Sequence, residues 1–179
     1  MLTVSPWIER SFQFESPRSM YPNLVERIRG GPARAEDAVK DVPASLLVER
    51  MGTAWSIQEN IGHLVDIEPL MAGRLDDFIS GVSQLRAWEE TNRATWQANH
   101  NDRPIQELLD GFRDARSRLV ERFDTFDDSL IERTAFHPRL KRPMRVIDLV
   151  YFIAEHDDYH LAKISAVKRH GLALQAIAQ

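Results

Sequence analysis

The stretch "VIDLVYFIAEHDDYHLAKISAVKRHG" (residues 146–171) predicts a long amphipathic α-helix that ends at its final glycine, Gly171. At 100° per residue, its apolar positions return every three to four residues and form one stripe. Two histidines, His156 and His160, lie on that stripe together with apolar residues such as Ile153. Because a helix buries its apolar stripe, this pattern places two imidazoles where leucine is usual.

Three further segments carry helical periodicity or helical start and stop signals, and we expect them to pack against this helix. They are residues 21–30, followed by a short helical segment at 31–43, then 56–80 and 102–123. Ser56 with Glu59 three residues later is the pattern of a capping box at the start of the helix over 56–80.

Two segments interrupt the helical pattern. Residues 81–103 are weakly periodic and predict a long connection with some helical turns, whereas 132–145 predict a turn or a small hairpin. No convincing run of alternating strands is present, so the sequence predicts an all-α bundle in a single domain over residues 1–179. The long connection argues against a simple up-down-up-down chain.

Composition excludes several classes of function. The formal net charge of −4 gives no basic excess for nucleic-acid binding. The absence of cysteine excludes a disulfide framework, a cysteine-ligated metal and a cysteine nucleophile. No stretch of about 18 apolar residues is present, so we expect no membrane span. The first residues lack the pattern of a secretory signal. We therefore expect a cytoplasmic protein that interacts with neither membranes nor nucleic acid.

The spacing of His156 and His160 brings two imidazoles close enough to bind one ion. A buried imidazole without partners costs about 1–3 kcal/mol, so the pair needs either a metal or hydrogen bonds in the core. Both interpretations stay open from these two residues alone. His63 lies at the edge of the apolar stripe of 56–80; alone it would be a flank or core residue, but beside this pair it is the candidate third ligand.

Three histidine ligands would leave an open coordination position, as catalytic zinc sites do. Imidazole also suits Ni²⁺, Fe²⁺ and Cu²⁺, so the residues do not identify the metal. The remaining histidines, His100, His137 and His170, are expected at the surface.

At this point the residues resemble a known family. "TAWSIQENIGHLVDIE" (53–68) and "FHPRLKRPMRVIDLVYFIAEHDDYHLAKI" (136–164) resemble the DinB-like superfamily, in particular its YfiT-like branch. The features that match are a Trp-Ser pair before a helix with one histidine, a His-Pro loop, and a late helix with two histidines four apart. The resemblance spans about residues 20–170.

The resemblance implies a four-helix bundle with up-down-down-up connectivity and a core over about residues 20–170. It also implies a divalent metal, commonly Ni²⁺ or Zn²⁺, held by His63, His156 and His160, and a homodimer. Members are described as metal-dependent hydrolases, and characterised relatives are S-transferases that use low-molecular-weight thiols such as bacillithiol or mycothiol.

Four functions are compatible with these features. The first two are enzymes acting on a small molecule: a hydrolase that uses a metal-activated water, or a thiol S-transferase that uses a metal-bound thiolate. The third is a non-catalytic metal-binding stress-response bundle, in which the ion contributes folding energy. The fourth is a metal-free interaction module.

Other residues were weaker candidates for the site. Glu59, Asp66 and Asp157 are possible partners that orient the imidazoles, with a solvated surface position as the alternative for each. Trp88 and Trp96, in the long connection, would either roof a metal pocket or belong to the core, and the core is favoured. Arg93 between them would bind an anionic substrate group or, more simply, be a solvated arginine.

Overall fold

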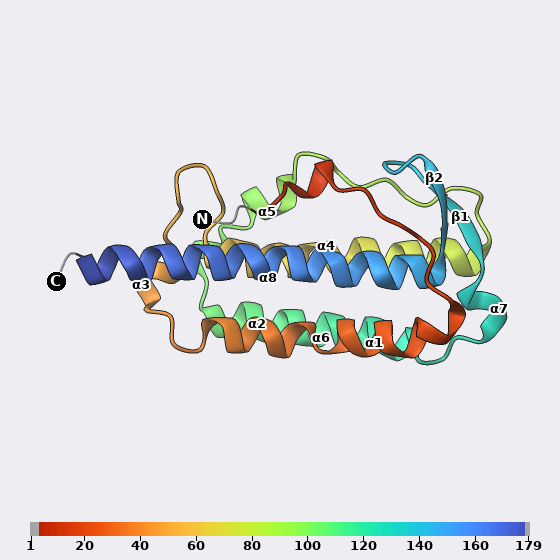
Figure 1. Cartoon of the computed structure of the whole chain (residues 1–179), viewed down its shortest axis with the longest axis horizontal. Helices are drawn as coiled ribbons and strands as arrows, with labels where there is room; N and C mark the ends of the chain where they lie inside the picture. The colour runs from red at the N-terminus through yellow and green to blue at the C-terminus, as the bar shows by residue number, and fades with distance from the viewer. Residues whose placement is uncertain (1–3, 178–179) are drawn as a thin grey trace.

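The computed structural model describes residues 4–177, and four long helical segments lying side by side dominate it (Figure 1). The first segment is formed by two consecutive helices separated by Gly30. The four segments are α1 (Tyr21–Arg29) with α2 (Gly31–Val39), then α4 (Ile57–Ser80), α6 (Ile105–Phe123) and α8 (Val146–Ile177).

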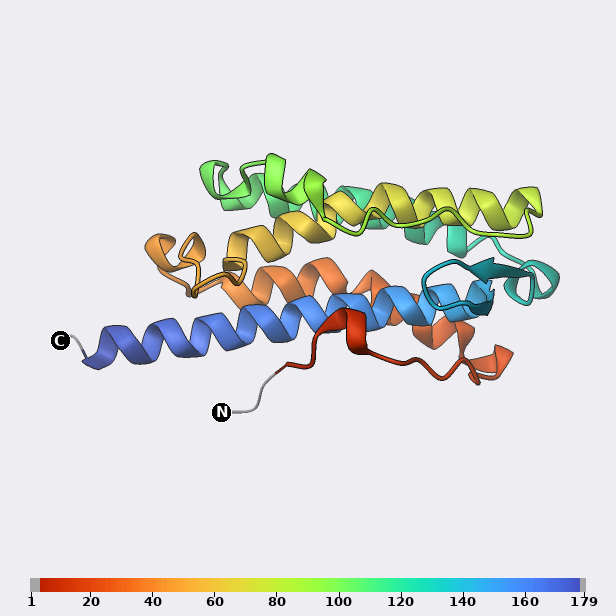
Figure 2. The ribbon, with the colours of Figure 1, turned by 90° about the horizontal axis from the view of Figure 1, so that it is seen from above.

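The connectivity is up-down-down-up. In Figure 1, α1, α2 and α8 run toward the end of the bundle where the C-terminus lies, whereas α4 and α6 both run the opposite way. Because α4 and α6 are parallel, the chain must return along the whole bundle between them, and residues 81–104 do so in Figure 2. This confirms the predicted all-α four-helix bundle with a long connection between its second and third main helices.

Short elements complete the chain, and one of them is a small antiparallel hairpin, as predicted for 132–145. In the hairpin Ala135 pairs with Met144. The short elements are η1 (Trp7–Glu9), η2 (Arg18–Met20), α3 (Ala44–Leu47), α5 (Arg93–Gln97), η3 (His100–Asp102), α7 (Asp128–Ile131), β1 (Thr134–His137) and β2 (Arg142–Arg145).

The structure confirms the predicted start of α4 but not the predicted end of α8. At the start of α4, Glu59 N–H donates to Ser56 Oγ at 3.0 Å and Ser56 N–H donates to Glu59 Oε2 at 2.9 Å, which confirms the capping box. The predicted end of the last helix at Gly171 is wrong, because α8 continues to Ile177. A Cβ at Gly171 would lie 2.2 Å from Leu46 Cδ1, so this glycine lets α3 pack closely on α8.

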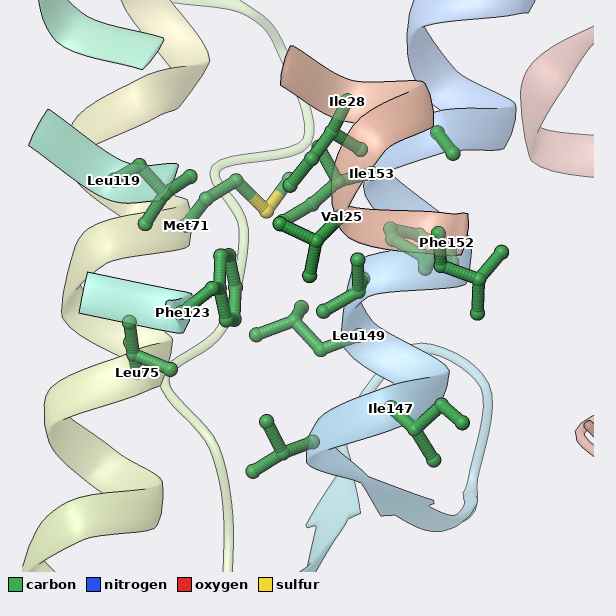
Figure 3. Packing of buried hydrophobic residues seen from close by; sticks show 14 of the residues in the cluster. Val25, Ile28, Met71, Leu75, Leu119, Phe123, Ile147, Leu149, Phe152 and Ile153 are labelled. Atoms are coloured by element: carbon green, nitrogen blue, oxygen red, sulfur yellow. The ribbon is translucent and has the colours of Figure 1, made fainter. Parts of the chain in front are cut away.

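The apolar core has two clusters. The larger cluster lies at the hairpin end, where side chains from α1, α4, α6 and α8 point toward one another (Figure 3). The smaller cluster joins α2 and α3 to the other end of the bundle. On α8 the larger cluster ends at Ala154 and the smaller one begins at Ile164. The turns between these positions carry buried polar residues, so a polar layer divides the core.

Candidate metal centre

Three histidines from two helices meet in this polar layer. His63 comes from α4, and His156 and His160 lie one turn apart on α8. One ring nitrogen of each lies within 4.8 Å of the others, and each side chain is buried, with at most 5% of the residue exposed. The structure thus brings together the three histidines that the sequence singled out.

The ring of His160 is oriented by a buried amide. His160 Nδ1 lies 2.9 Å from Asn60 Oδ1, and Asn60 Nδ2 donates to the backbone carbonyls of Ser56 at 2.7 Å and Trp55 at 3.2 Å. These two carbonyls accept hydrogen bonds only, so they fix the amide with its oxygen toward the histidine. His160 therefore carries its proton on Nδ1, and the lone pair of Nε2 is free to bind an ion.

The ring of His63 is oriented through a threonine. His63 Nδ1 lies 3.0 Å from Thr95 Oγ1. Burial would raise the pKa of Asp66, but hydrogen bonds with His100 and Thr95 lower it overall, so this carboxylate is ionised and only accepts. The Thr95 hydroxyl then donates to Asp66 and accepts the Nδ1 proton of His63. As in His160, the Nε2 lone pair of His63 is left free.

The three imidazoles are neutral at neutral pH. Burial lowers the pKa of His63 to about 4, and it lowers the pKa values of His156 and His160 well below their usual range. Repulsion from His63 lowers the pKa values of His156 and His160 further. Neutral imidazole is the form that binds metals. Three uncharged nitrogen donors with two oriented lone pairs fit a divalent cation such as Zn²⁺ or Ni²⁺.

The histidines line a cavity of about 410 Å³ whose walls include four tryptophans, a phenylalanine and a tyrosine. The ring centroid of Trp55 lies 4.8 Å from that of His63, and the centroid of Trp7 lies 5.0 Å from that of His156. Trp7 belongs to the N-terminal segment and is not among the residues that the sequence singled out. A tryptophan in such a segment was a signal for burial, because a large apolar ring is rarely left in water.

The two tryptophans of the long connection both line this cavity. Trp88 also packs partly buried against the larger cluster, as the core interpretation predicted. For Trp96 that interpretation is wrong: the residue is 47% exposed, and its ring centroid lies 5.8 Å from that of Trp55. Arg93 is exposed and does not line the cavity.

Of the three candidate carboxylates, only Asp66 is linked to the histidines. Glu59 caps α4 and accepts from Arg50 Nε at 2.9 Å. Asp157 instead accepts from Arg116 Nη2 at 3.0 Å, and the same nitrogen donates to Glu68 Oε1 at 2.6 Å. One residue along a helix is a rotation of 100°, so Asp157 faces α6 while its neighbour in the chain faces the metal centre.

The expectation that the other histidines are at the surface is wrong for two of them. His100 is 2% exposed, and its Nε2 lies 2.8 Å from Asp66 Oδ2. Its ring packs on Gly62, where a Cβ would lie 2.3 Å from it. His137 is 1% exposed and lines the cavity. His170 is half-buried within α8 rather than at its end.

The fold and the site define a class: a four-helix bundle with a buried three-histidine cluster fit for a divalent ion. The sequence model of the DinB superfamily matches residues 27–164. The chain therefore belongs to the DinB superfamily. No protein among those with curated annotation matches the chain in sequence. No helix within residues 4–177 is long and apolar enough to cross a membrane.

The chain shares its fold with solved structures. One is YfiT from Bacillus subtilis, described as "a probable metal-dependent hydrolase with an unusual four-helix bundle topology". It is 16% identical with a TM-score of 0.79, over 90% of this chain and 93% of YfiT. Another is a mycothiol-dependent maleylpyruvate isomerase, 10% identical with a TM-score of 0.67, over 87% of this chain and 63% of the isomerase. At these identities the likeness establishes the fold alone.

Proposed function

We propose that this protein is a divalent-metal-dependent enzyme whose ion is held by His63, His156 and His160. The observation that carries the proposal is the convergence of three buried, neutral imidazoles at the wall of a cavity, with their other nitrogens engaged in two cases. A hydrogen-bonded core pair would not need a third histidine with a free Nε2. A purely structural ion would normally have four protein ligands, and the described residues offer three in this group.

The chain's own residues perform separate tasks in this site. Asn60 and the Asp66–Thr95 pair hold two imidazoles in their ligand orientation. The rings of Trp7 and Trp55 pack on His156 and His63 and cover part of the cluster. When bound, a divalent ion lowers the pKa of a coordinated water or thiol and polarises an electrophile. Because the three ligands are uncharged, they leave the full charge of the ion available for this effect.

Transfer of a low-molecular-weight thiol is the chemistry that the cavity supports best. Among the described residues that line it, Glu90 is the only carboxylate and it is exposed, while Asp66 is engaged by His100 and Thr95. A thiol needs a weaker base than water does, since its own pKa is far lower. The chain contains no cysteine, so the thiol would come from a small molecule.

Hydrolysis is the second candidate. It draws support from the likeness to YfiT, which is described as a metal-dependent hydrolase, as the thiol reaction draws support from the mycothiol-dependent isomerase. A non-catalytic metal-binding bundle and a metal-free interaction module remain the competing hypotheses. The identity of the metal as nickel or zinc, the cytoplasmic location and the homodimer stay predictions.

Metal content measured by elemental mass spectrometry tests the site. We expect about one divalent ion per chain in the wild type, and its loss in the His156→Ala, His160→Ala double variant. His170→Ala is the matched control, because it removes a histidine of the same helix outside the cluster and should retain the ion. A wild-type chain that takes up no metal at neutral pH would refute both enzymatic proposals.

Turnover by metal-loaded protein separates the two chemistries. The thiol reaction predicts that 1-chloro-2,4-dinitrobenzene is consumed only when bacillithiol, mycothiol or glutathione is present. Hydrolysis predicts release of p-nitrophenol from p-nitrophenyl acetate without any thiol. Metal binding without turnover in either assay, together with a large fall in melting temperature on chelation, would favour the non-catalytic bundle instead.

A further inference from the structure

The cavity contains a second group of polar side chains, and these are hydrogen-bond donors that no carboxylate of the described residues neutralises. The first is Arg74 on α4, which is 1% exposed and lines the cavity. Its guanidinium donates from Nε to the Arg86 carbonyl at 3.3 Å, and within residues 4–177 it has no carboxylate at ion-pair distance. The two acids that follow it on α4 are bound elsewhere: Asp76 by Arg122 and Asp77 by Arg86. A buried cation without a partner is costly, so such residues are rare without a purpose.

The second donor is Arg139, from the turn of the hairpin. Its guanidinium carbon lies 5.7 Å from the ring centroid of Trp7 and 5.6 Å from that of Phe152. Its Nη2 is buried and has no hydrogen-bond partner among the described residues, and no ion pair involves it. Stacking on two rings holds the guanidinium plane but leaves its donors unused.

The third donor is His137 at the end of β1. Its Nδ1 accepts the backbone N–H of Leu140 at 3.2 Å, so the neutral ring carries its proton on Nε2. This Nε2 is buried without a partner in the described structure. Burial, together with the charges of Arg74 and Arg139, lowers the pKa of His137 to about 3, as expected for three groups that lie near one another.

We propose that Arg74, Arg139 and His137 form an anion-binding subsite that holds a carboxylate of the substrate beside the metal centre. This inference rests on the proposed function and adds the substrate class to it. Two guanidinium groups and an imidazole N–H supply the forked donors that a carboxylate accepts. Met71, Phe152 and Trp7 line the same cavity, so the ligand is an organic acid with an apolar body.

The separation of the two sites limits the length of the substrate. Arg74 follows His63 by 11 residues on α4, which is about 16 Å of helix rise, and helical side chains lean back toward the N-terminus. On α8, Phe152 beneath Arg139 lies one turn, about 6 Å, before His156. The carboxylate is therefore held between these two limits, roughly 6–16 Å from the histidines along the bundle.

A pair of probes that differ only in charge tests the subsite. We would measure binding of 4-phenylbutyrate and its neutral amide, 4-phenylbutyramide, to metal-loaded protein by isothermal titration calorimetry. We expect the acid to bind at least about tenfold more tightly, and Arg74→Gln or Arg139→Gln to remove that preference. Arg113→Gln is the matched control: it lowers the charge equally but lies exposed on α6, outside the cavity. Equal affinities for acid and amide in the wild type would overturn the proposal.

Two further arms make the result specific. The same titrations on the His156→Ala, His160→Ala variant exclude direct binding of the acid to the ion, and the preference should persist there. Its disappearance in that variant would overturn the subsite. A phosphonate analogue, 3-phenylpropylphosphonate, tests the alternative anion; tighter binding than the acid would overturn the assignment to a carboxylate.

Thermal stability separates recognition from a structural role. Because Arg74 is buried without a carboxylate partner, we expect Arg74→Met to raise the melting temperature while it removes the preference for the acid. A lower melting temperature with an unchanged preference would make Arg74 structural and overturn the proposal. The two proposals can be refuted separately. A preference for the acid over the amide without metal uptake would refute only the metal-dependent function. Metal uptake without that preference would refute only the anion-binding subsite.

Discussion

The hydrogen bond that His160 donates to Asn60 is predicted to control metal affinity. Asn60→Leu keeps the approximate size of the side chain but removes the acceptor that holds His160 Nδ1 at 2.9 Å. The ring then loses its fixed orientation, and the buried Nδ1 proton loses its partner, which costs about 1–3 kcal/mol. Loss of such an outer partner typically weakens metal binding about 10- to 100-fold, equivalent to about 1.4–2.7 kcal/mol.

The assay is a competition titration of Zn²⁺ or Ni²⁺ against a chromogenic chelator at pH 7.5. Asn60→Asp keeps an acceptor at the same position, so it should retain most of the affinity that Asn60→Leu loses. Gln58→Leu is the matched control, because Gln58 is another buried amide of the same helix and donates only to the backbone carbonyls of His100 and Arg103. It should lower stability with a smaller effect on the metal. Wild-type affinity in folded Asn60→Leu, or an equal loss in Gln58→Leu, would refute the reasoning.

Three other predictions concern stability, each measured by urea denaturation of metal-free protein. Burial lowers the folded-state pKa of His63 to about 4, below its value near 6.5 in the unfolded chain, so the unfolded state binds more protons between these values. The stability that His63 retains above pH 6.5 is thus lost as the pH falls toward 4, by up to about 3 kcal/mol, and a His63→Gln variant with the same pH dependence would contradict this. Arg116→Met leaves the buried carboxylates of Glu68 and Asp157 without their shared cation and should lower the free energy of unfolding by about 3–5 kcal/mol. A loss under 1 kcal/mol would show that solvent reaches these carboxylates. Gly62→Ala should destabilise the protein by about 1–3 kcal/mol, because its Cβ would lie 2.3 Å from the ring of His100. In Gly111→Ala the new Cβ meets only Val65, at 3.7 Å, so this change should be neutral or stabilise by up to about 1 kcal/mol. Equal effects of the two glycine changes would disprove the close approach.

Much of the site was visible in the sequence because its signals are local. The positions of His156 and His160 follow from helical periodicity, which fixes the face of a helix from residue spacing alone. The capping box at Ser56 likewise depends on neighbours within one turn. His63 required one assumption, that its helix packs against α8, and the family resemblance implied the same ligand.

The remaining parts of the site depend on contacts between segments far apart in the sequence. His100 and Thr95 are buried because the long connection folds back onto α4, and no periodicity marks where an irregular segment packs. The same is true of Trp7 in the N-terminal segment and of Arg139 in the hairpin turn.

The sequence by itself determined the helices, the faces they bury and the three histidines that converge. Only the tertiary structure decided which polar groups surround these histidines, which carboxylate joins them and which cations are left without partners. The physical reason is that the spacing of residues within a helix fixes which side of it is buried. What lies against that side is fixed by the packing of loops and helices, whose separation in the chain carries no such geometric rule.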